Sequence, residues 1–456
     1  MSKKEPIVRH SHRIVSVFVE NLFGLYTYDI RVGDPSGGPG PTLLVLYGDN
    51  GTGKTTILQL VYHLLGKEDN RGHRTYLARI PFRQLRVTLD PPITVEAYRR
   101  DPDLVGSYRL RISRGNTVVE AEVIVESDLT VRSPAKGTPA ERQMWNSMLQ
   151  GIATLDLTFF FLTADRRSDQ PQDTEVLMPP EGLEPEVIVR DTLAWRRRRE
   201  REGVDLRLEE TVERLEKWIR DEALKGTHLG EASSHTVYAD IAKRIAQTRR
   251  PGRPRKAEAD QLVKALVALE SRSKPYACLG LISAPHLGEI VVALENSAAA
   301  TRQLIANVVS PYVESLRARL DALQEIQELI TLLLERINAF FRNKTVTYEL
   351  ARGLVIATPQ GKPLPPSQLS SGERQLLGLL AQVVVARKAA TVFLIDEPEI
   401  SLNVKWQRVL VDTLLQLVRG NDVQFILATH SLELLATHRE HVHRLEAAAK
   451  NDDRAN

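Results

Sequence analysis

The sequence predicts an α/β protein that combines a parallel sheet, an antiparallel β layer and a helical insertion. Apolar strand runs alternate with helical patterns in residues 42–65 and again in residues 369–430, which is typical of a parallel sheet. Short alternating runs between residues 80 and 132, broken by glycine and proline, indicate antiparallel strands. Between residues 185 and 345, apolar residues recur at intervals of three and four, which indicates helices with coiled-coil-like seams.

The N-terminal segment contains strands of both kinds. Residues 14–20 and 26–32 alternate apolar and polar side chains, as two half-buried strands joined by a turn would. Thr42–Tyr47 is almost continuously apolar, which indicates a strand covered on both faces, and a helix follows it. Residues 155–162 form a further candidate for a buried strand.

The insertion is expected to hold at least two helices. Leu208, Val212, Leu215 and Ile219 share one helix face, and a second apolar seam runs from Val313 to Phe340. At about 1.5 Å per residue the second helix would project by several tens of ångströms. We expect Pro311 to break or kink its start.

The C-terminal segment returns to alternating strands and helices. We expect β structure over residues 345–358, helices over 369–387 and 404–418, buried strands over 391–395 and 423–428, and a final helix with a polar tail. The chain accordingly divides into an N-terminal lobe (1–184), a helical arm (185–344) and a C-terminal lobe (345–456).

Composition excludes several classes of protein. With 42% apolar residues the chain can bury a large core, and 61 basic against 58 acidic residues do not make the polycation that coats nucleic acid. The one cysteine, Cys278, cannot form an internal disulfide. The most apolar run, residues 376–386, is too short to cross a bilayer, and Met1 is followed by no apolar leader. A cytoplasmic protein with no membrane partner is expected.

A phosphate-binding loop is the strongest local signal. Gly48-Asp-Asn-Gly-Thr-Gly-Lys-Thr55 satisfies G-x4-G-K-[ST] and lies between a buried strand and a helix. Its backbone N–H groups and the helix N-terminus would cradle a triphosphate, Lys54 would span the β- and γ-phosphates, and Thr55 would bind Mg²⁺. The alternative is a plain glycine-rich turn before a helix. The candidate ATP-binding residues of the loop are Asn50, Gly51, Gly53, Lys54, Thr55 and Thr56.

An acidic pair, Asp396 and Glu397, ends the apolar run that starts at Thr391. The carboxyl end of a strand is where ligands lie in open α/β sheets. Asp396 would bind Mg²⁺, and Glu397 would orient the attacking water or accept its proton. Such a pair is common after a strand, so it indicates a nucleotide-binding site only in combination with the glycine loop.

Two further signals accompany these. Ser370 and Glu373 have capping-box spacing around Gly372, which marks a helix N-terminus that could bind an anion or could simply be capped. His430 follows a predicted strand, 33 residues after Glu397. A histidine at a strand end is usually structural, but this position also suits a γ-phosphate sensor.

Together these motifs resemble the ABC-type ATPases of the SMC and RecF kind, over residues 12–170 and 345–440. The resemblance comprises Walker A, the signature 369–373, Walker B, a D-loop-like segment 401–403 and the switch His430. It implies an ABC-ATPase head that hydrolyses ATP slowly with Mg²⁺ in a regulatory role. It also implies a head-to-tail homo-oligomer, in which Ser370 and Gly372 act on the nucleotide of the other subunit. Asn403 departs from the usual D-loop, and Asp165 is the substitute proposed for the missing Q-loop residue near the metal.

Within that group the chain resembles anti-phage ATPases: AriA of PARIS, PtuA of Septu, and OLD proteins without their TOPRIM nuclease. The similarity lies in residues 21–24, 46–57 and 161–167. It implies a sensor that responds to a phage protein and controls a separate effector such as a nuclease. Only 26 residues follow His430, which is short of a TOPRIM domain.

Basic residues in the insertion leave an alternative open. The run from Arg249 to Lys256 contains Gly-Arg-Pro and could contact DNA, as in a RecF-like repair clamp, although basic runs are more often solvated. A transporter motor is a third reading, which the large insertion disfavours. His438, His441 and His443 lack the carboxylate pattern of a known metal site.

Overall fold

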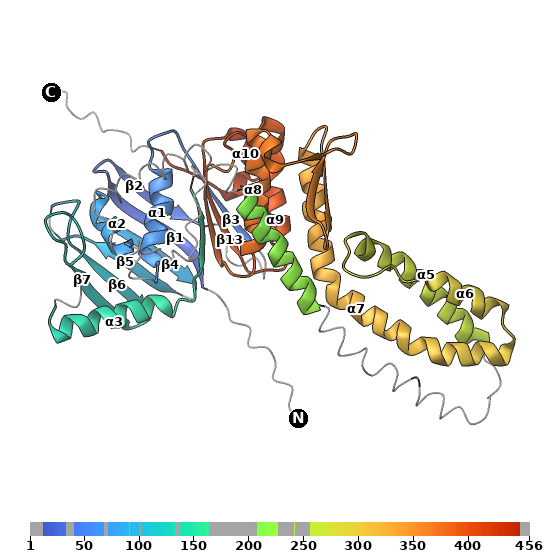
Figure 1. Ribbon diagram of the computed structural model, residues 1–456. Helices are drawn as coiled ribbons and strands as arrows, with labels where there is room; N and C mark the ends of the chain where they lie inside the picture. Colours follow the sequence, from blue (N-terminus) through green and yellow to red (C-terminus); the bar gives the residue numbers. More distant parts are fainter. Residues whose placement is uncertain are drawn as a thin grey trace, which may run out of the picture. The chain divides into compact units, whose positions relative to one another are not determined.

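The computed structural model describes residues 12–32, 41–67, 72–90, 92–100, 102–132, 137–163, 208–226, 241 and 256–446 (Figure 1). It divides into two compact units, the first comprising Met1–Glu181 with Ala386–Asn456 and the second Gly182–Val385. The glycine loop, the acidic pair and His430 belong to the first unit. The signature residues belong to the second, together with the helical insertion. The domain boundaries expected from the sequence, after residues 184 and 344, stay a prediction.

Two sheets form the first unit. One is fully antiparallel, in the order β2 (Tyr26–Arg31), β1 (Arg13–Leu22), β4 (Gln84–Asp90), β5 (Ile93–Tyr98), β6 (Tyr108–Arg114), β7 (Thr117–Val123). The other is fully parallel, in the order β14 (Val442–Arg444), β3 (Thr42–Tyr47), β13 (Gln424–Thr429), β12 (Val392–Asp396), β8 (Phe159–Leu162). The predicted α/β class, with a parallel sheet and an antiparallel layer, is confirmed.

Helix α1 (Lys54–Leu65) joins the two sheets into one core. It contacts β12 and β13 of the parallel sheet and β5 of the antiparallel sheet (Figure 1). Such a position requires apolar side chains on more than one face, and Ile57, Leu58 and Leu60 are at most 1% exposed. The other helices of this unit are α2 (His73–Arg79), α3 (Pro139–Ala153), α9 (Val404–Leu417) and α10 (Leu432–Leu435).

Arg74 completes the C-terminal end of α1. Its guanidinium donates hydrogen bonds to the carbonyls of His63 (2.8 Å), Leu64 (3.1 Å) and Gly66 (2.8 Å). These are carbonyls that no helical N–H can reach, so a cation placed there offsets both the unpaired acceptors and the helix dipole. The helix whose first residue is Lys54 is thus fixed at its opposite end.

A histidine pair at the same end makes the first unit sensitive to acid. His63 Nδ1 lies 2.9 Å from His73 Nδ1, and burial, with the charges of His73 and Arg74, lowers the pKa of His63 to about 3. The folded protein keeps His63 neutral, whereas the unfolded chain binds a proton below a pH of about 6.5. Stability should therefore fall as pH falls from about 6.5 towards 3, by about 2 kcal/mol at pH 5.

Thermal unfolding of the parent and of His63→Phe at pH 7 and pH 5 measures this effect. Phenylalanine keeps the ring but cannot titrate, so the variant should lose less stability than the parent on acidification. Equal losses in both proteins would show that His63 is not the responsible group.

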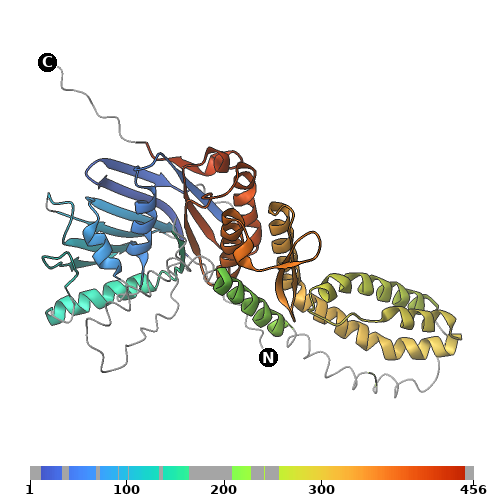
Figure 2. The ribbon, with the colours of Figure 1, turned by 45° about the horizontal axis from the view of Figure 1, so that its top comes forward.

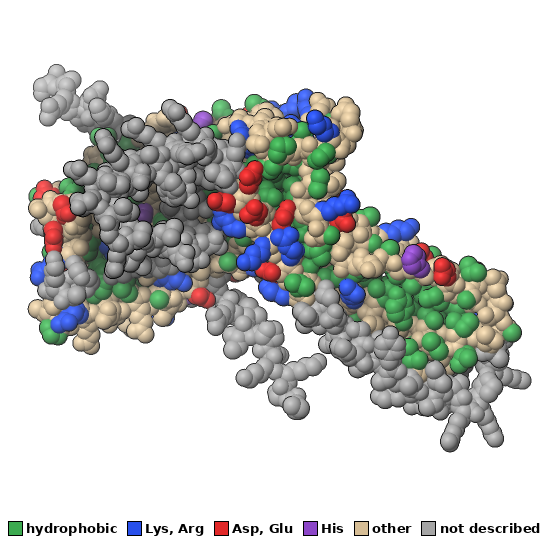
Figure 3. All heavy atoms as spheres, in the orientation of Figure 1, with side chains coloured by type: hydrophobic (Ala, Val, Ile, Leu, Met, Phe, Trp, Pro, Cys, Tyr) green, Lys and Arg blue, Asp and Glu red, His purple; other side chains and the backbone are tan. Residues whose placement is uncertain are grey.

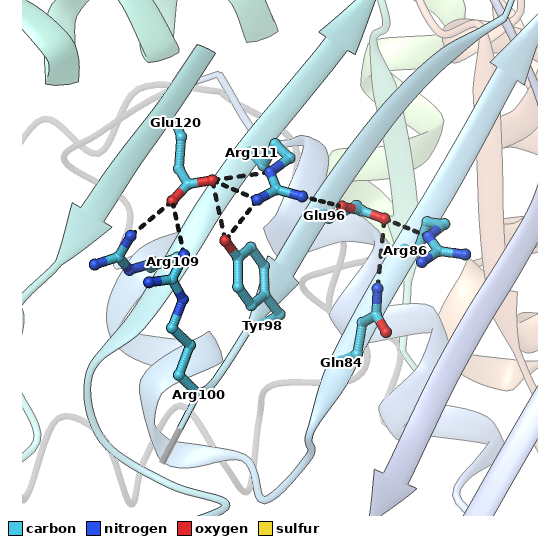
Figure 4. A network of polar contacts seen from close by, with 8 residues as sticks. All are labelled: Gln84, Arg86, Glu96, Tyr98, Arg100, Arg109, Arg111 and Glu120. Carbon is cyan, nitrogen blue, oxygen red and sulfur yellow. Dashed lines mark hydrogen bonds and ion pairs between the residues drawn. The ribbon is translucent and has the colours of Figure 1, made fainter. Parts of the chain in front are cut away.

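The outer face of the antiparallel sheet carries a network of paired charges (Figure 4). Glu120 on β7 binds Arg109 at 2.9 Å and Arg111 at 2.7 Å, and Arg111 also lies 3.8 Å from Glu96. Burial raises the pKa of Glu120, but its hydrogen bonds to Arg111, Arg109 and Tyr98 outweigh that effect and lower the pKa to about 2. The arginines on this face thus have carboxylate partners on the same sheet.

The second unit is mainly helical. It contains a helix at residues 208–226, then α5 (Lys256–Cys278), α6 (Leu287–Asn296) and α7 (Ala299–Phe340), strands β9 (Thr345–Glu349), β10 (Gly353–Ala357) and β11 (Pro363–Leu364), and α8 (Ser371–Ala386). Helices α5 and α6 pack along α7 to form an arm (Figure 2). Hydrophobic side chains gather on the surface of this arm (Figure 3). Val267 on α5, Val292 on α6 and Leu304 on α7 are about half-exposed. The expected helical arm is present.

Three details of the sequence-based prediction are wrong. Pro311 does not break α7, which begins earlier, at Ala299, and continues through Pro311 over its 42 residues while α5 packs against it; a kink at Pro311 stays a prediction. The segment after His430 forms only the short α10 before β14 adds to the parallel sheet beside β3. Strand β8 begins at Phe159 instead of residue 155, since α3 occupies the chain up to Ala153. Within the described ranges, every helix is too short or too polar to span a bilayer.

Candidate nucleotide-binding site

Strand order brings three of the predicted motifs to one edge of the parallel sheet. Strands β3, β13 and β12 are neighbours, with Tyr47 paired to Thr429 and Ala428 paired to Asp396. The glycine loop follows β3, His430 follows β13, and Glu397 follows β12. Because parallel strands end at the same edge, residues from three distant parts of the chain meet there.

The glycine loop has a backbone that only glycine adopts without strain at two positions. Gly51 and Gly53 have φ values of 86° and 87°, and a Cβ on Gly53 would lie 2.9 Å from Leu22 Cδ2. Lys54 is 5% exposed, and its Nζ donates to the carbonyls of Gly48 (2.7 Å) and Asp49 (2.9 Å). The ammonium group therefore lies over the loop. Asn50 and Gly51 are exposed at its tip, and Thr56 is half-buried in the first turn of α1.

Thr55 and Asp396 connect the loop to the acidic pair. Thr55 Oγ1 donates a hydrogen bond of 2.8 Å to Asp396 Oδ2. Asp396 is 1% exposed, and its Oδ1 has no hydrogen-bond partner among the described residues. Burial raises the pKa of Asp396 to about 6, and the hydrogen bond from Thr55 opposes that shift. A hydroxyl beside a carboxylate with an unpaired buried oxygen fits Mg²⁺, which prefers such oxygen ligands and keeps several waters.

Glu397 and His430 lie beside each other at the next position along this edge. Glu397 has a φ of 47°, held by a 2.8 Å hydrogen bond from its N–H to the carbonyl of Ala428. His430 Nδ1 is 3.4 Å from Glu397 Oε1, and the imidazole is half-exposed. The predicted base and the predicted phosphate sensor are therefore in contact.

The signature residues form the predicted capping box in the second unit. The N–H and hydroxyl of Ser370 each donate to Glu373 Oε2 at 2.8 Å, and the Glu373 N–H donates back to Ser370 Oγ at 3.4 Å. Ser370 is exposed, whereas Gly372 is buried. Lys344, which follows α7, places Nζ 2.9 Å from both carboxylate oxygens of Glu373. Burial raises the pKa of Glu373, but Lys344 and Ser370 outweigh it, so the pKa lies below its ordinary value.

Removal of the Lys344 charge should loosen the signature turn. Lys344→Met would leave Glu373, which is 6% exposed, without its cation, at a cost of about 3 kcal/mol. Hydrogen exchange of the backbone amides of Ser370 and Glu373 should become about 100-fold faster. Arg342→Met, an exposed change two residues earlier, is the control. Unchanged exchange in Lys344→Met would contradict this role for the ion pair.

The remaining predicted site residues either lie outside the described residues or make contacts with a structural role. Asp165 and the side chains from Arg249 to Lys256 lie outside the described residues. Asn403 caps α9, its side chain accepting from Trp406 N at 3.1 Å, which gives this departure from the usual D-loop a structural role. His438 Nε2 lies 3.2 Å from Asp412, and no group of three metal-binding side chains occurs in the described part of the chain.

Two residues that contact predicted site residues were missed from the sequence. Glu399 is 3% exposed and contacts both Thr429 and His430. The run Asp-Glu-Pro-Glu from 396 to 399 contains it, so a third acidic residue could have been noticed. Lys344 is 29 residues from Glu373, and no local pattern connects the two.

Part of the chain is similar to a known protein family. Residues 289–436 match the family described as "AAA domain, putative AbiEii toxin, Type IV TA system". This match contains the signature, the acidic pair and His430, and begins after the glycine loop. No curated protein matches the chain.

Solved structures that resemble the chain include two Smc heads. The Smc head domain with an extended coiled coil bound to the C-terminal domain of ScpA, derived from Pyrococcus furiosus, is 13% identical, with 93% of this chain and 91% of that chain covered and a TM-score of 0.34. The SmcHead bound to the C-winged helix domain of ScpA is 10% identical, with the same coverage and a TM-score of 0.32.

Proposed function

We propose that the protein binds ATP with Mg²⁺ at the carboxyl edge of its parallel sheet and hydrolyses it. The observation that carries this proposal is the 2.8 Å contact between Thr55 in the glycine loop and Asp396, which are 341 residues apart in the chain. The family match over residues 289–436 supports the same activity.

Each side chain has a distinct task in this proposal. Lys54 and the N–H groups of the loop bind the β- and γ-phosphates. Thr55 and Asp396 hold Mg²⁺, which supplies positive charge against the phosphate oxygens. Glu397 orients a water molecule and accepts its proton as that water attacks, and His430 contacts the γ-phosphate.

The complete site needs a second copy of the chain. We infer that the exposed Ser370 and the N-terminus of α8 close over the nucleotide of a partner in a head-to-tail dimer. ATP would favour this closed dimer only to the extent that it binds the closed form more tightly than the open one.

Mixing two defective variants tests this arrangement. Lys54→Ala and Ser370→Arg should each be inactive alone, because each spoils both composite sites. An equimolar mixture forms heterodimers with one intact site, so about one quarter of the parental phosphate release should return. Ser367→Arg, an exposed change in the preceding turn, is the control. A mixture as inactive as its components would refute the shared site.

The biological role we propose is that of a sensor in anti-phage defence that controls a separate effector. Its support is the sequence resemblance together with the family description, which names a putative toxin of a type IV TA system. Co-expression of the chain with its neighbouring gene, followed by phage challenge, tests this role. Protection should require both proteins and should be lost in Lys54→Ala, and no protection in any combination would remove the proposal.

A further inference from the structure

Glu399 is a buried carboxylate with no part in the hydrolysis described so far. It follows Asp396 by three residues, in the turn between β12 and α9, and is 3% exposed. Its Oε2 has no hydrogen-bond partner among the described residues. A buried carboxylate with an unpaired oxygen costs stability, so a purpose outside packing is expected.

The other oxygen of Glu399 binds the end of β13. Its Oε1 accepts a hydrogen bond from the hydroxyl of Thr429 and another, of 3.1 Å, from the backbone N–H of His430. Thr429 is fully buried, and its Oγ1 also accepts the N–H of Ser431 at 2.9 Å. Residues 429–431 are therefore hydrogen-bonded to the Glu399 carboxylate, either directly or through Thr429.

This connection extends to the helix that follows the turn. Ser431 Oγ donates to Gln407 Oε1 at 2.7 Å, and Gln407 Nε2 donates to the carbonyl of Leu402 at 2.8 Å. Leu402 in turn is bound through its N–H to the carbonyl of Glu399 at 2.9 Å. The result is a closed ring of hydrogen bonds that joins the segment after β12 to the segment after β13.

The imidazole of His430 lies inside this arrangement. Its Nδ1 is 3.4 Å from Glu397 Oε1 and 3.6 Å from Glu399 Oε1. Carboxylate oxygens accept hydrogen bonds, so both favour an N–H at Nδ1 and orient that edge of the ring towards them. Nε2, on the opposite edge of the ring, is then directed away from the two carboxylates.

We propose that Glu399 is a positioning residue that fixes the backbone and the ring of His430, so that Nε2 faces the γ-phosphate. This inference rests on the proposed ATP hydrolysis. Because the same carboxylate belongs to the turn that carries Glu397, displacement of one segment would displace the other, and His430 and Glu397 would move as one element.

A graded pair of substitutions tests the role. Glu399→Ala removes both acceptor bonds, whereas Glu399→Gln keeps an oxygen of similar position. We expect kcat for ATP to fall about tenfold or more in the alanine variant and by less than about threefold in the glutamine variant. Nucleotide affinity should stay within about twofold in both variants, since Glu399 is not part of the glycine loop. Thr429→Val, which removes the hydroxyl without changing the shape, should reproduce part of the loss.

A second measurement separates this inference from the proposed function. The imidazole NMR signals of His430 should shift or broaden in Glu399→Ala and stay near their parental positions in Glu399→Gln, whether or not ATP is hydrolysed. A parental kcat in Glu399→Ala would overturn the inference, and so would an unchanged His430 signal. A loss of kcat together with affinity and thermal stability would instead assign Glu399 to the fold. A parent protein without ATPase activity would refute the proposed function, while the NMR comparison would still decide the role of Glu399.

Discussion

A Glu397→Gln variant should bind ATP as tightly as the parent and hydrolyse it at no more than about one-hundredth of the parental rate. Glutamine has nearly the same size and can still accept a hydrogen bond from water, but it cannot take the proton that water must release. General-base catalysis contributes roughly 10²- to 10⁴-fold, which sets the expected loss. Single-turnover hydrolysis and equilibrium binding of labelled ATP measure the two quantities separately.

The same variant should accumulate the closed dimer, because ATP would enter and would not be consumed. Light scattering with Mg²⁺ and ATP should then report twice the mass of the chain. Glu433→Gln is the matched control, since Glu433 is an acidic residue that pairs with Arg408 on the surface. If Glu397→Gln turned over ATP at the parental rate, the assignment of Glu397 as the base would be wrong.

Lys54→Ala should weaken ATP binding by at least about 100-fold, which corresponds to about 3 kcal/mol. The ammonium group is held over the loop by the carbonyls of Gly48 and Asp49, in the same loop whose N–H groups would bind phosphate. The substitution removes the only positive charge of the glycine loop from the proposed binding site of a polyanion. Isothermal titration with a non-hydrolysable ATP analogue measures the change.

Lys67→Ala is the control for that experiment. Lys67 is exposed beyond the other end of α1, and its removal changes the net charge by the same amount. Affinity should be parental in this variant if the effect of Lys54 is local. Equal weakening by both substitutions would indicate long-range attraction of the nucleotide by overall charge instead of direct contact with Lys54.

Local sequence patterns predicted the elements of the site well. Gly51, Gly53 and Lys54 lie in a loop between a strand and a helix because short-range rules govern such a turn: small residues, positive φ values and a helix start. The capping box of Ser370 and Glu373 follows for the same reason, since its partners are three residues apart. The strands Thr42–Tyr47 and Val392–Asp396 were recognisable because burial on both faces requires continuous apolar sequence.

Long-range contacts were not predictable in this way. Lys344 pairs with Glu373 across 29 residues of sequence, and Glu399 pairs with His430 across 31. No periodic pattern or motif spacing in the sequence connects either pair. Proline disfavours helix interiors by about 3 kcal/mol relative to alanine, and at Pro311 the packing of α5 on α7 overrides that preference. The last strand, β14, is only three residues long, and it forms a strand because it pairs with β3 of the parallel sheet.

The sequence by itself determined which residues are the candidates for binding a triphosphate and hydrolysing it, since a glycine loop, an acidic pair and a histidine after a strand are recognised from short motifs. Only the tertiary structure decided that Thr55 reaches Asp396 and that Glu397, Glu399 and His430 share one edge, because that depends on the strand order β3-β13-β12. Strand order is set by the packing of the whole core around α1, which no single segment encodes.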